Sequence, residues 1–147
     1  SMQEYIQERI DANTNSRKES ENSFLNSLKK NPNIKKTSSG LYYEIFKEGQ
    51  GPKPTGKDIL IVNYEGRLID GKIFDSSYMR GQPANFRLGA LIPGFKEGLQ
   101  LIKKGGKIRL YIPPSLGYGS RELPGIPAES TLIFDLELLD LKPVSSD

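Results

Sequence analysis

The sequence of 147 residues contains neither cysteine nor histidine. The absence of cysteine excludes a disulfide framework and a thiolate metal site. The absence of histidine removes the commonest metal ligand and the usual acid–base group of neutral pH, and it excludes every catalytic triad built on histidine. We therefore expect no metal and no cofactor, and a site that works through an apolar pocket with a few polar groups.

Long hydrophobic runs and an excess of one charge are absent as well. No apolar run approaches the length of about 20 residues that a membrane-spanning helix needs. The net charge is only +3. Residues 1–36 hold seven Lys/Arg and five Asp/Glu, and residues 37–147 hold fourteen and thirteen. Because the charges are interspersed, we expect solvated surface and no nucleic-acid partner.

Residues 1–36 are expected to form a helical extension with a linker. Ile6 and Ile10 lie four positions apart, as do Phe24 and Leu28, which is the spacing of one helix face. Short polar side chains between these pairs compete for the backbone. Two interpretations stay open: the helix breaks there, or it continues because a partner covers it.

The ends of this extension carry two further signals. Asn31-Pro32-Asn33 predicts the end of the helix, and Lys29 and Lys30 in its last turn suit the helix dipole. Ser1-Met2 resembles the remnant of a tag, which would mean that a native N-terminus has been removed.

Residues 37–147 predict one domain of the α+β class. Phe95, Leu99 and Ile102 share one face of a short helix that opens at Pro93-Gly94 and ends at Gly105-Gly106. Alternating or β-rich segments predict strands over residues 41–46, 58–68, 86–88, 107–113 and 131–141. We expect a curved antiparallel β-sheet of about five strands wrapped around this helix, preceded by the N-terminal helix.

The segment from Val62 to Tyr118 places aromatic residues beside glycines and turns. Asp70-Gly71 predicts a tight hairpin turn, and the acidic spacing of a calcium loop is absent. Gly117-Tyr118-Gly119 lacks the third glycine of a dinucleotide fingerprint. The pattern favours an apolar pocket framed by a few polar groups.

Several separated blocks carry a family resemblance. They are Val62-Asn63-Tyr64-Glu65-Gly66, Gly71-Lys72-Ile73-Phe74-Asp75-Ser76-Ser77, Ile92-Pro93-Gly94-Phe95, Tyr118-Gly119 and Thr131-Leu132-Ile133-Phe134-Asp135. In this order they resemble the FKBP family, the macrolide-binding peptidyl-prolyl isomerases, over roughly Gly40 to Leu141. The extension, Arg80-Gly81-Gln82-Pro83-Ala84 and Glu97-Gly98-Leu99-Gln100 are most similar to the bacterial Mip-type branch.

The resemblance assigns pocket residues position by position. It implies catalytic positions at Tyr64, Phe74, Asp75, Tyr118 and Phe134, and substrate-binding positions at Arg80, Phe86, Leu91, Ile92, Phe95, Leu123 and Ile126. In the family, the carboxylate matched by Asp75 is buried and pairs with an arginine. The segment of Leu91 and Ile92 offers backbone N–H groups to a bound carbonyl. Leu123 and Ile126 lie in a loop over the pocket.

Each of these residues also has a simpler interpretation. Strand alternation alone would place Tyr64, Phe74, Phe86 and Phe134 in a core, and Asp75 with Arg80 could be an ordinary surface pair. Their joint occurrence in the family's order favours the pocket.

The resemblance implies a peptidyl-prolyl cis–trans isomerase that acts on proline-containing polypeptides without a covalent intermediate and is inhibited by macrolides. Phe95 stands where the family usually has tryptophan, and Ala84 where some members have an aromatic residue. These two positions motivate an alternative, a prolyl-segment binding or chaperone module with little turnover. A third interpretation is a structural dimer in which the extension does the main work.

Partners and compartment follow from the same resemblance. The extension predicts a possible homodimer through the N-terminal helix. The apolar Leu123 predicts a preference for apolar residues before proline. The lack of cysteine suits periplasm and cytoplasm alike, and we favour the bacterial cell envelope, periplasmic or as an outer-membrane lipoprotein, with any signal segment missing from the sequence.

Overall fold

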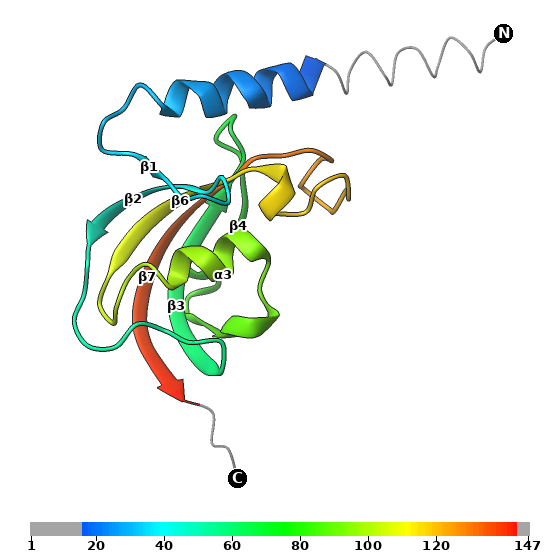
Figure 1. The fold of residues 1–147 in the computed structure, drawn as a ribbon. Helices are drawn as coiled ribbons and strands as arrows, with labels where there is room; N and C mark the ends of the chain where they lie inside the picture. The colour runs from blue at the N-terminus through cyan, green and yellow to red at the C-terminus, as the bar shows by residue number, and fades with distance from the viewer. Residues whose placement is uncertain (1–15, 144–147) are drawn as a thin grey trace, which may run out of the picture.

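A seven-stranded antiparallel sheet curves around one helix, α3, in the computed structural model, which describes residues 16–143 (Figure 1). The strands follow the order β1-β2-β6-β7-β3-β4, and β5 pairs with β3. The strands are β1 (Lys35–Lys36), β2 (Tyr42–Lys47), β3 (Asp58–Arg67), β4 (Ile73–Ser76), β5 (Ala84–Arg87), β6 (Lys107–Ile112) and β7 (Leu132–Pro143). The helices are α2 (Ser77–Arg80) and α3 (Pro93–Leu99), with 3-10 turns η1 (Leu88–Ala90) and η2 (Pro114–Leu116). A further helix covers residues 16–28.

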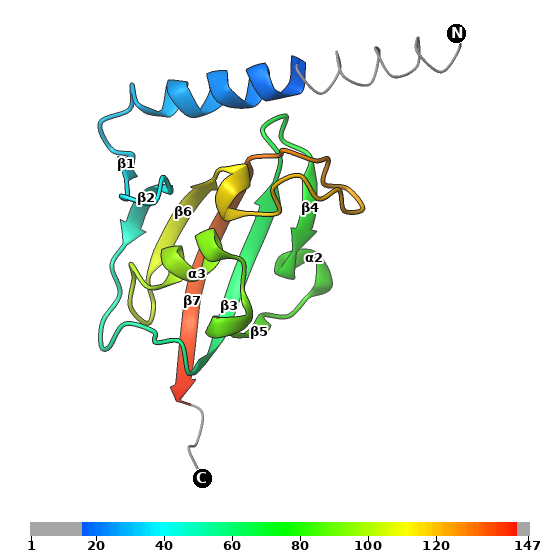
Figure 2. The same ribbon diagram turned by 45° about the vertical axis from the view of Figure 1, so that its right-hand side comes forward.

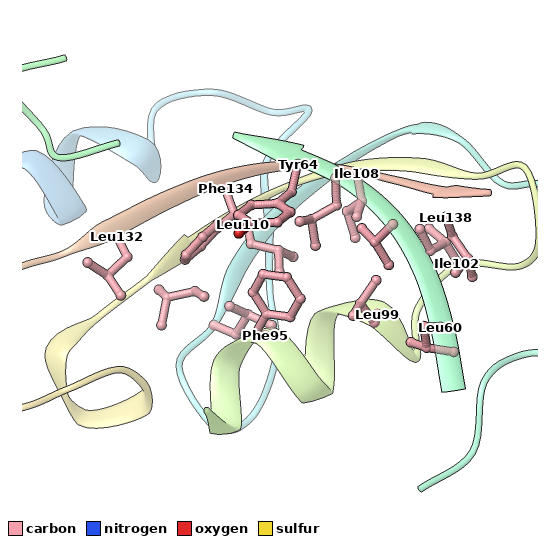
Figure 3. Packing of buried hydrophobic residues seen from close by; sticks show 14 of the residues in the cluster. Leu60, Tyr64, Phe95, Leu99, Ile102, Ile108, Leu110, Leu132, Phe134 and Leu138 are labelled. Atoms are coloured by element: carbon pink, nitrogen blue, oxygen red, sulfur yellow. The ribbon is translucent and has the colours of Figure 1, made fainter. Parts of the chain in front are cut away.

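The main core lies between α3 and the concave face of the sheet (Figure 3). Strand alternation sends every second side chain of β3, β6 and β7 to this face. Phe95, Leu99 and Ile102 meet these side chains from the opposite side and are at most 4% exposed. The buried sheet residues include Leu60, Val62, Tyr64, Ile108, Leu110, Ile112, Leu132, Phe134, Leu136 and Leu138.

Two glycines let α3 approach the sheet closely. A Cβ atom on Gly98 would lie 2.3 Å from Leu110 Cδ1, and one on Gly94 would lie 2.6 Å from Ile112 Cγ2. Real Cβ atoms do not approach other atoms this closely. The two glycines therefore set the depth at which Phe95 enters the core.

A second, smaller cluster lies on the opposite face of the sheet. Tyr42, Tyr111 and Ile133 are buried there together with Leu28 of the N-terminal helix, and Phe24 packs against them. The Phe24 ring stands 6.1 Å from that of Tyr111. The helix therefore covers one end of the outer face, where it crosses the end of the sheet in Figures 1 and 2.

The predicted α+β fold is confirmed, with three differences in its elements. β1 and β4 were not predicted, because two and four residues are too few for a periodic pattern. The short helix α2 was not predicted for the same reason. The predicted helix end at Gly105-Gly106 is wrong: α3 ends at Leu99, and Ile102 reaches the core from a turn.

The helix predicted before the linker extends to residue 28 and is followed by a turn. The spacing of Ile6 and Ile10 lies outside the described residues. Of the possible break at Asn13-Thr14-Asn15-Ser16, only Ser16 is described, and it lies in the helix. Between residues 16 and 143, no helix is long and apolar enough to cross a membrane.

Candidate functional site

One cavity of about 290 Å³ opens at the end of the sheet where α3 begins. Its lining comes from β3, β4, β5, β7, α3 and the turns beside α3 and η2. The lining residues are Tyr64, Asp75, Phe86, Ala90, Leu91, Ile92, Phe95, Tyr118 and Phe134. Most of this lining is apolar, and the polar groups stand on two sides.

Phe95 forms the floor, since its ring contacts rings from three strands. The ring centroids lie 5.0 Å from Phe134, 5.4 Å from Phe86 and 6.2 Å from Tyr64, all in edge-to-face geometry. Figure 3 shows Phe95 rising from α3 toward Tyr64 and Phe134. Edge-to-face pairs stabilise one relative orientation of the rings, so the cavity has rigid apolar walls.

One wall carries a charged pair. The Tyr64 hydroxyl donates to Asp75 Oδ2 at 2.5 Å and accepts from Arg80 Nη2 at 2.6 Å. Arg80 Nη1 donates to Asp75 Oδ1. The guanidinium carbon also stands 5.4 Å from the centre of the Tyr64 ring. Burial and the hydrogen bond to Asp75 raise the pKa of Tyr64, so its hydroxyl stays protonated and holds the pair at the cavity.

The helix α2 holds Arg80 in this position. The Ser76 hydroxyl accepts from Met79 N–H and caps the helix, and Gly81 ends it in the left-handed region at φ 79°. The fully buried Ser77 accepts from Tyr64 N–H at 2.8 Å and donates to Asn63 Oδ1 at 3.0 Å. Ser77 thus ties α2 to β3 beside Tyr64. The sequence analysis assigned Ser77 no role.

Phe74 supports the cavity from behind. Its ring meets that of Phe134 edge to face at 5.5 Å, and it does not line the cavity. Both rings lie against the bare backbone of Gly66, where a Cβ would be 2.6 Å from Phe134 and 2.8 Å from Phe74. The glycine of the Val62–Gly66 block is therefore needed for ring packing.

The other side of the cavity offers single donors. Ile92 lines it and caps α3, and its backbone N–H has no protein acceptor within residues 16–143. The N–H of Leu91 already donates to Leu88 O at 3.3 Å. Tyr118 also lines the cavity, and its hydroxyl has no hydrogen-bond partner in the part of the chain that the structure describes.

The cavity brings together eight of the twelve residues assigned from the sequence: Tyr64, Asp75, Phe86, Leu91, Ile92, Phe95, Tyr118 and Phe134. Arg80 reaches it only through its partners, and Phe74 through Phe134. Leu123 and Ile126 do not line it. They exchange two backbone hydrogen bonds of 2.9 Å with each other, and Ile126 is buried in the core.

Two details differ from the sequence-based expectation. Asp75 was expected to be buried, but its side chain is 41% exposed, because the pair with Arg80 faces solvent on its outer side. Ala90 lines the cavity and was not assigned. A methyl group in a turn gives no sequence signal for a site.

Larger hollows elsewhere lack this convergence. One of about 660 Å³ runs along the edge of β2 beside Pro32 and Lys35, and one of about 720 Å³ lies between Gly51 and Lys104. Neither of these two cavities is lined by several aromatic rings together with a hydrogen-bond donor that lacks an acceptor. Among the described residues, no group of three or more acidic side chains could hold a metal ion.

The fold and the cavity define a class of domain: a small α+β module with a mostly apolar cavity between aromatic walls. Residues 51–139 match the family described as "FKBP-type peptidyl-prolyl cis-trans isomerase", and residues 1–45 match the "Domain amino terminal to FKBP-type peptidyl-prolyl isomerase". The chain therefore belongs to the FKBP-type peptidyl-prolyl cis-trans isomerase family, which confirms the resemblance found in the sequence.

Individual relatives agree with this family. The chain is 56% identical over 114 residues to the FKBP-type isomerase FkpA of Escherichia coli (strain K12), covering 78% of this chain and 42% of FkpA. It is 45% identical over 126 residues to the isomerase Mip of Coxiella burnetii, covering 84% of this chain and 54% of Mip. The chain thus spans about half the length of these curated relatives. The crystal structure of FkpA from Escherichia coli matches with a TM-score of 0.83 at 43% identity, covering 98% of this chain and 71% of that one.

Proposed function

We propose that this chain catalyses cis–trans isomerisation of X–Pro peptide bonds, with the prolyl ring held in the aromatic cavity. The observation that carries this proposal is the cavity itself. The rings of Tyr64, Phe86 and Phe134 meet Phe95 edge to face, and the one charged residue among the described lining, Asp75, is paired with Arg80. Such a site can bind an apolar ring, and its lining offers no nucleophile that would attack the peptide bond.

The chemistry needs no more than this. Rotation about an amide bond meets a barrier of about 18–20 kcal/mol, because resonance is lost in the twisted state. The twisted amide has less charge separation than the planar one. Apolar walls therefore disfavour the planar ground state relative to the twisted state. An acceleration of about 10⁴-fold requires only about 5.5 kcal/mol of such differential stabilisation.

We assign the polar groups to orientation of the substrate. The N–H of Ile92, which has no acceptor within residues 16–143, can donate to a substrate carbonyl, and the Tyr118 hydroxyl can donate to another. Tyr64, Asp75 and Arg80 hold one wall rigid, and Phe86, Phe95 and Phe134 receive the prolyl ring. Leu123 lies outside the lining, so we assign it to substrate residues that extend beyond the cavity.

Kinetics on a short Leu-Pro peptide test the proposal. We expect the chain to accelerate isomerisation and a macrolide inhibitor to abolish the acceleration. Tyr118→Phe should lower kcat/KM only a few-fold, mainly through KM, because one neutral hydrogen bond contributes about 0.5–1.5 kcal/mol. Leu123→Asp should lower activity on Leu-Pro peptides, and an unchanged rate would remove its role in specificity.

The alternative is a module that binds prolyl segments with little turnover. The substitutions at Phe95 and Ala84 motivate it, since a smaller floor could bind without favouring the twisted amide. No acceleration in the kinetic assay, with the macrolide still bound, would favour this alternative.

We also propose the division into an extension over residues 1–36 and an isomerase domain over residues 37–147. The main core cluster supports this division, because all its members lie between Leu41 and Leu141. A homodimer through the extension is a further proposal. Light scattering tests it, with twice the mass of one chain expected.

A further inference from the structure

The N-terminal helix makes polar contacts with a loop of the isomerase domain. Glu21 is 8% exposed, which is unusual for a carboxylate. Its Oε2 accepts a hydrogen bond from the backbone N–H of the fully buried Thr131 at 2.9 Å. Burying a charged group is costly unless it is hydrogen-bonded. The helix therefore packs favourably only in the position where Glu21 accepts this hydrogen bond from Thr131.

Arg17 makes a second attachment one helical turn earlier. Its Nη2 donates to the carbonyl oxygen of Ala128 and lies 3.4 Å from Ser130 Oγ. The Ser130 hydroxyl in turn donates to Pro127 O at 2.6 Å. Two charged side chains on one face of the helix therefore hold the loop segment of residues 128–131, which leads into β7.

A backbone hydrogen bond connects the segment of residues 128–131 to the residue that follows Tyr118 of the cavity. The N–H of Glu129 donates to Gly119 O at 2.8 Å, and Gly119 follows Tyr118 in the chain. Glu129 has φ 60°, the one positive value among non-glycine residues of the described part. A residue in this region keeps its conformation only when its neighbours hold it. The contacts of Arg17 and Glu21 flank Glu129 on both sides.

We propose that Arg17 and Glu21 are positioning residues that couple the N-terminal helix to the prolyl site. By fixing residues 128–131 they fix Gly119, and through Gly119 the place of Tyr118 at the cavity rim. The extension then determines how tightly this domain holds proline-containing peptides, in addition to any role in assembly. This inference rests on the proposed isomerase function.

Steady-state kinetics on a Leu-Pro peptide with the full chain provide the main test. Because Tyr118 contacts the substrate before and during rotation, its displacement should raise KM more than it changes kcat. We expect Glu21→Ala to raise KM by about threefold to tenfold with kcat within about twofold. Glu21→Gln keeps an acceptor oxygen and should restore most of the affinity. Glu19→Ala removes the same charge from an exposed position of the same helix and should match the wild type.

A double-mutant cycle shows whether Glu21 acts through Tyr118. If it does, Glu21→Ala should have little further effect in a chain that already carries Tyr118→Phe, since the displaced hydroxyl is gone. Two independent, multiplying effects would overturn the proposed route.

Hydrogen exchange gives a readout besides activity. Glu21→Ala should remove protection at the amides of Thr131 and Glu129 while the amides of β3 and β7 keep theirs. Should Glu21→Ala fail to fold, Arg17→Met makes the same test through Ala128. Unchanged KM and unchanged exchange in a folded variant would overturn the inference. A wild-type chain without isomerase activity would instead contradict the proposed function.

Discussion

Phe95 determines the shape of the cavity, because it is the one residue whose ring touches the walls on three strands. Its side chain is 4% exposed, and Gly94 and Gly98 set how far it projects. Its ring therefore closes the inner side of the cavity. Removing this ring should affect both folding and binding.

We expect Phe95→Ala to lower the free energy of unfolding by about 3–5 kcal/mol, as buried Phe→Ala changes do. Urea denaturation followed by circular dichroism measures this loss. Phe46→Ala is the matched control, because Phe46 is 54% exposed and its loss should cost far less. An equal midpoint for Phe95→Ala and the wild type would show that the ring is not part of the core.

The aromatic residues of the cavity could be predicted from the sequence, whereas the residues that hold them could not. The aromatic residues stand beside glycines in blocks that follow the order of the FKBP family, and this order indicates a pocket. Ser77 gives no such signal, since its hydrogen bonds with Asn63 and Tyr64 join residues that approach only in the folded sheet. The same holds for Glu21 and Thr131, which are 110 positions apart. On a predicted helix, Glu21 is one of several charged residues with no apparent partner.

At the scale of elements, α3 and β6 are close enough for glycine to be required between them. Alanine normally favours a helix over glycine by about 0.5–1 kcal/mol. At Gly98 the added methyl group would meet Leu110 at 2.3 Å, so the packing cost reverses the sign.

We expect Gly98→Ala to destabilise the protein by about 1–3 kcal/mol. Gly56→Ala is the control, because a Cβ there would meet nothing within 4 Å. Thermal melting of both variants checks the difference. A melting temperature for Gly98→Ala at or above that of wild type would contradict the close approach of α3.

The outer face of the sheet joins three strands through one carboxylate. Asp135 on β7 accepts from Arg109 Nε of β6 at 2.6 Å and from Arg67 Nη1 of β3 at 2.7 Å. Burial opposes ionisation of Asp135, but the hydrogen bonds from Arg109 and Arg67 outweigh it and lower its pKa. A carboxylate with a lowered folded-state pKa stabilises the protein above its unfolded pKa of about 3.9. That contribution is lost as the pH falls through the folded value.

We therefore expect Asp135→Asn to cost about 1 kcal/mol at pH 7, a modest value because the side chain is 36% exposed and screened by solvent. The difference from wild type should shrink as the pH falls below about 3.9. Denaturant melts at a series of pH values measure it, with the exposed Glu122→Gln as control. A difference that stays constant down to the lowest pH would contradict the role of the charged carboxylate.

The elements themselves differ in how far the sequence determines them. β3 alternates between buried and partly exposed residues over all ten positions, and β7 does so from Phe134 to Leu138, so their pattern is clear. β1 has only two residues and exists because β2 offers an edge, with Lys35 opposite Tyr43. The end of α3 was predicted too late because Ile102 keeps the helical spacing although its backbone has left the helix.

At the scale of the whole molecule, two apolar clusters lie on opposite faces of one sheet. The larger cluster is contained in the isomerase domain, whereas the smaller one is completed by Leu28 of the N-terminal helix. The helix is thus seated by a few apolar contacts and by the hydrogen bonds of Arg17 and Glu21. Its detachment should be a local opening that leaves the main core intact.

Leu28→Asp tests this arrangement, because Leu28 is 7% exposed against Tyr42, Tyr111 and Ile133. A carboxylate cannot be buried there without a partner, so the helix should detach. Hydrogen exchange should show lost protection over residues 21–28, with protection of β3 and β7 retained. The exposed Lys18→Asp serves as control for the added negative charge. Loss of protection throughout the sheet would show instead that helix and domain unfold as one unit.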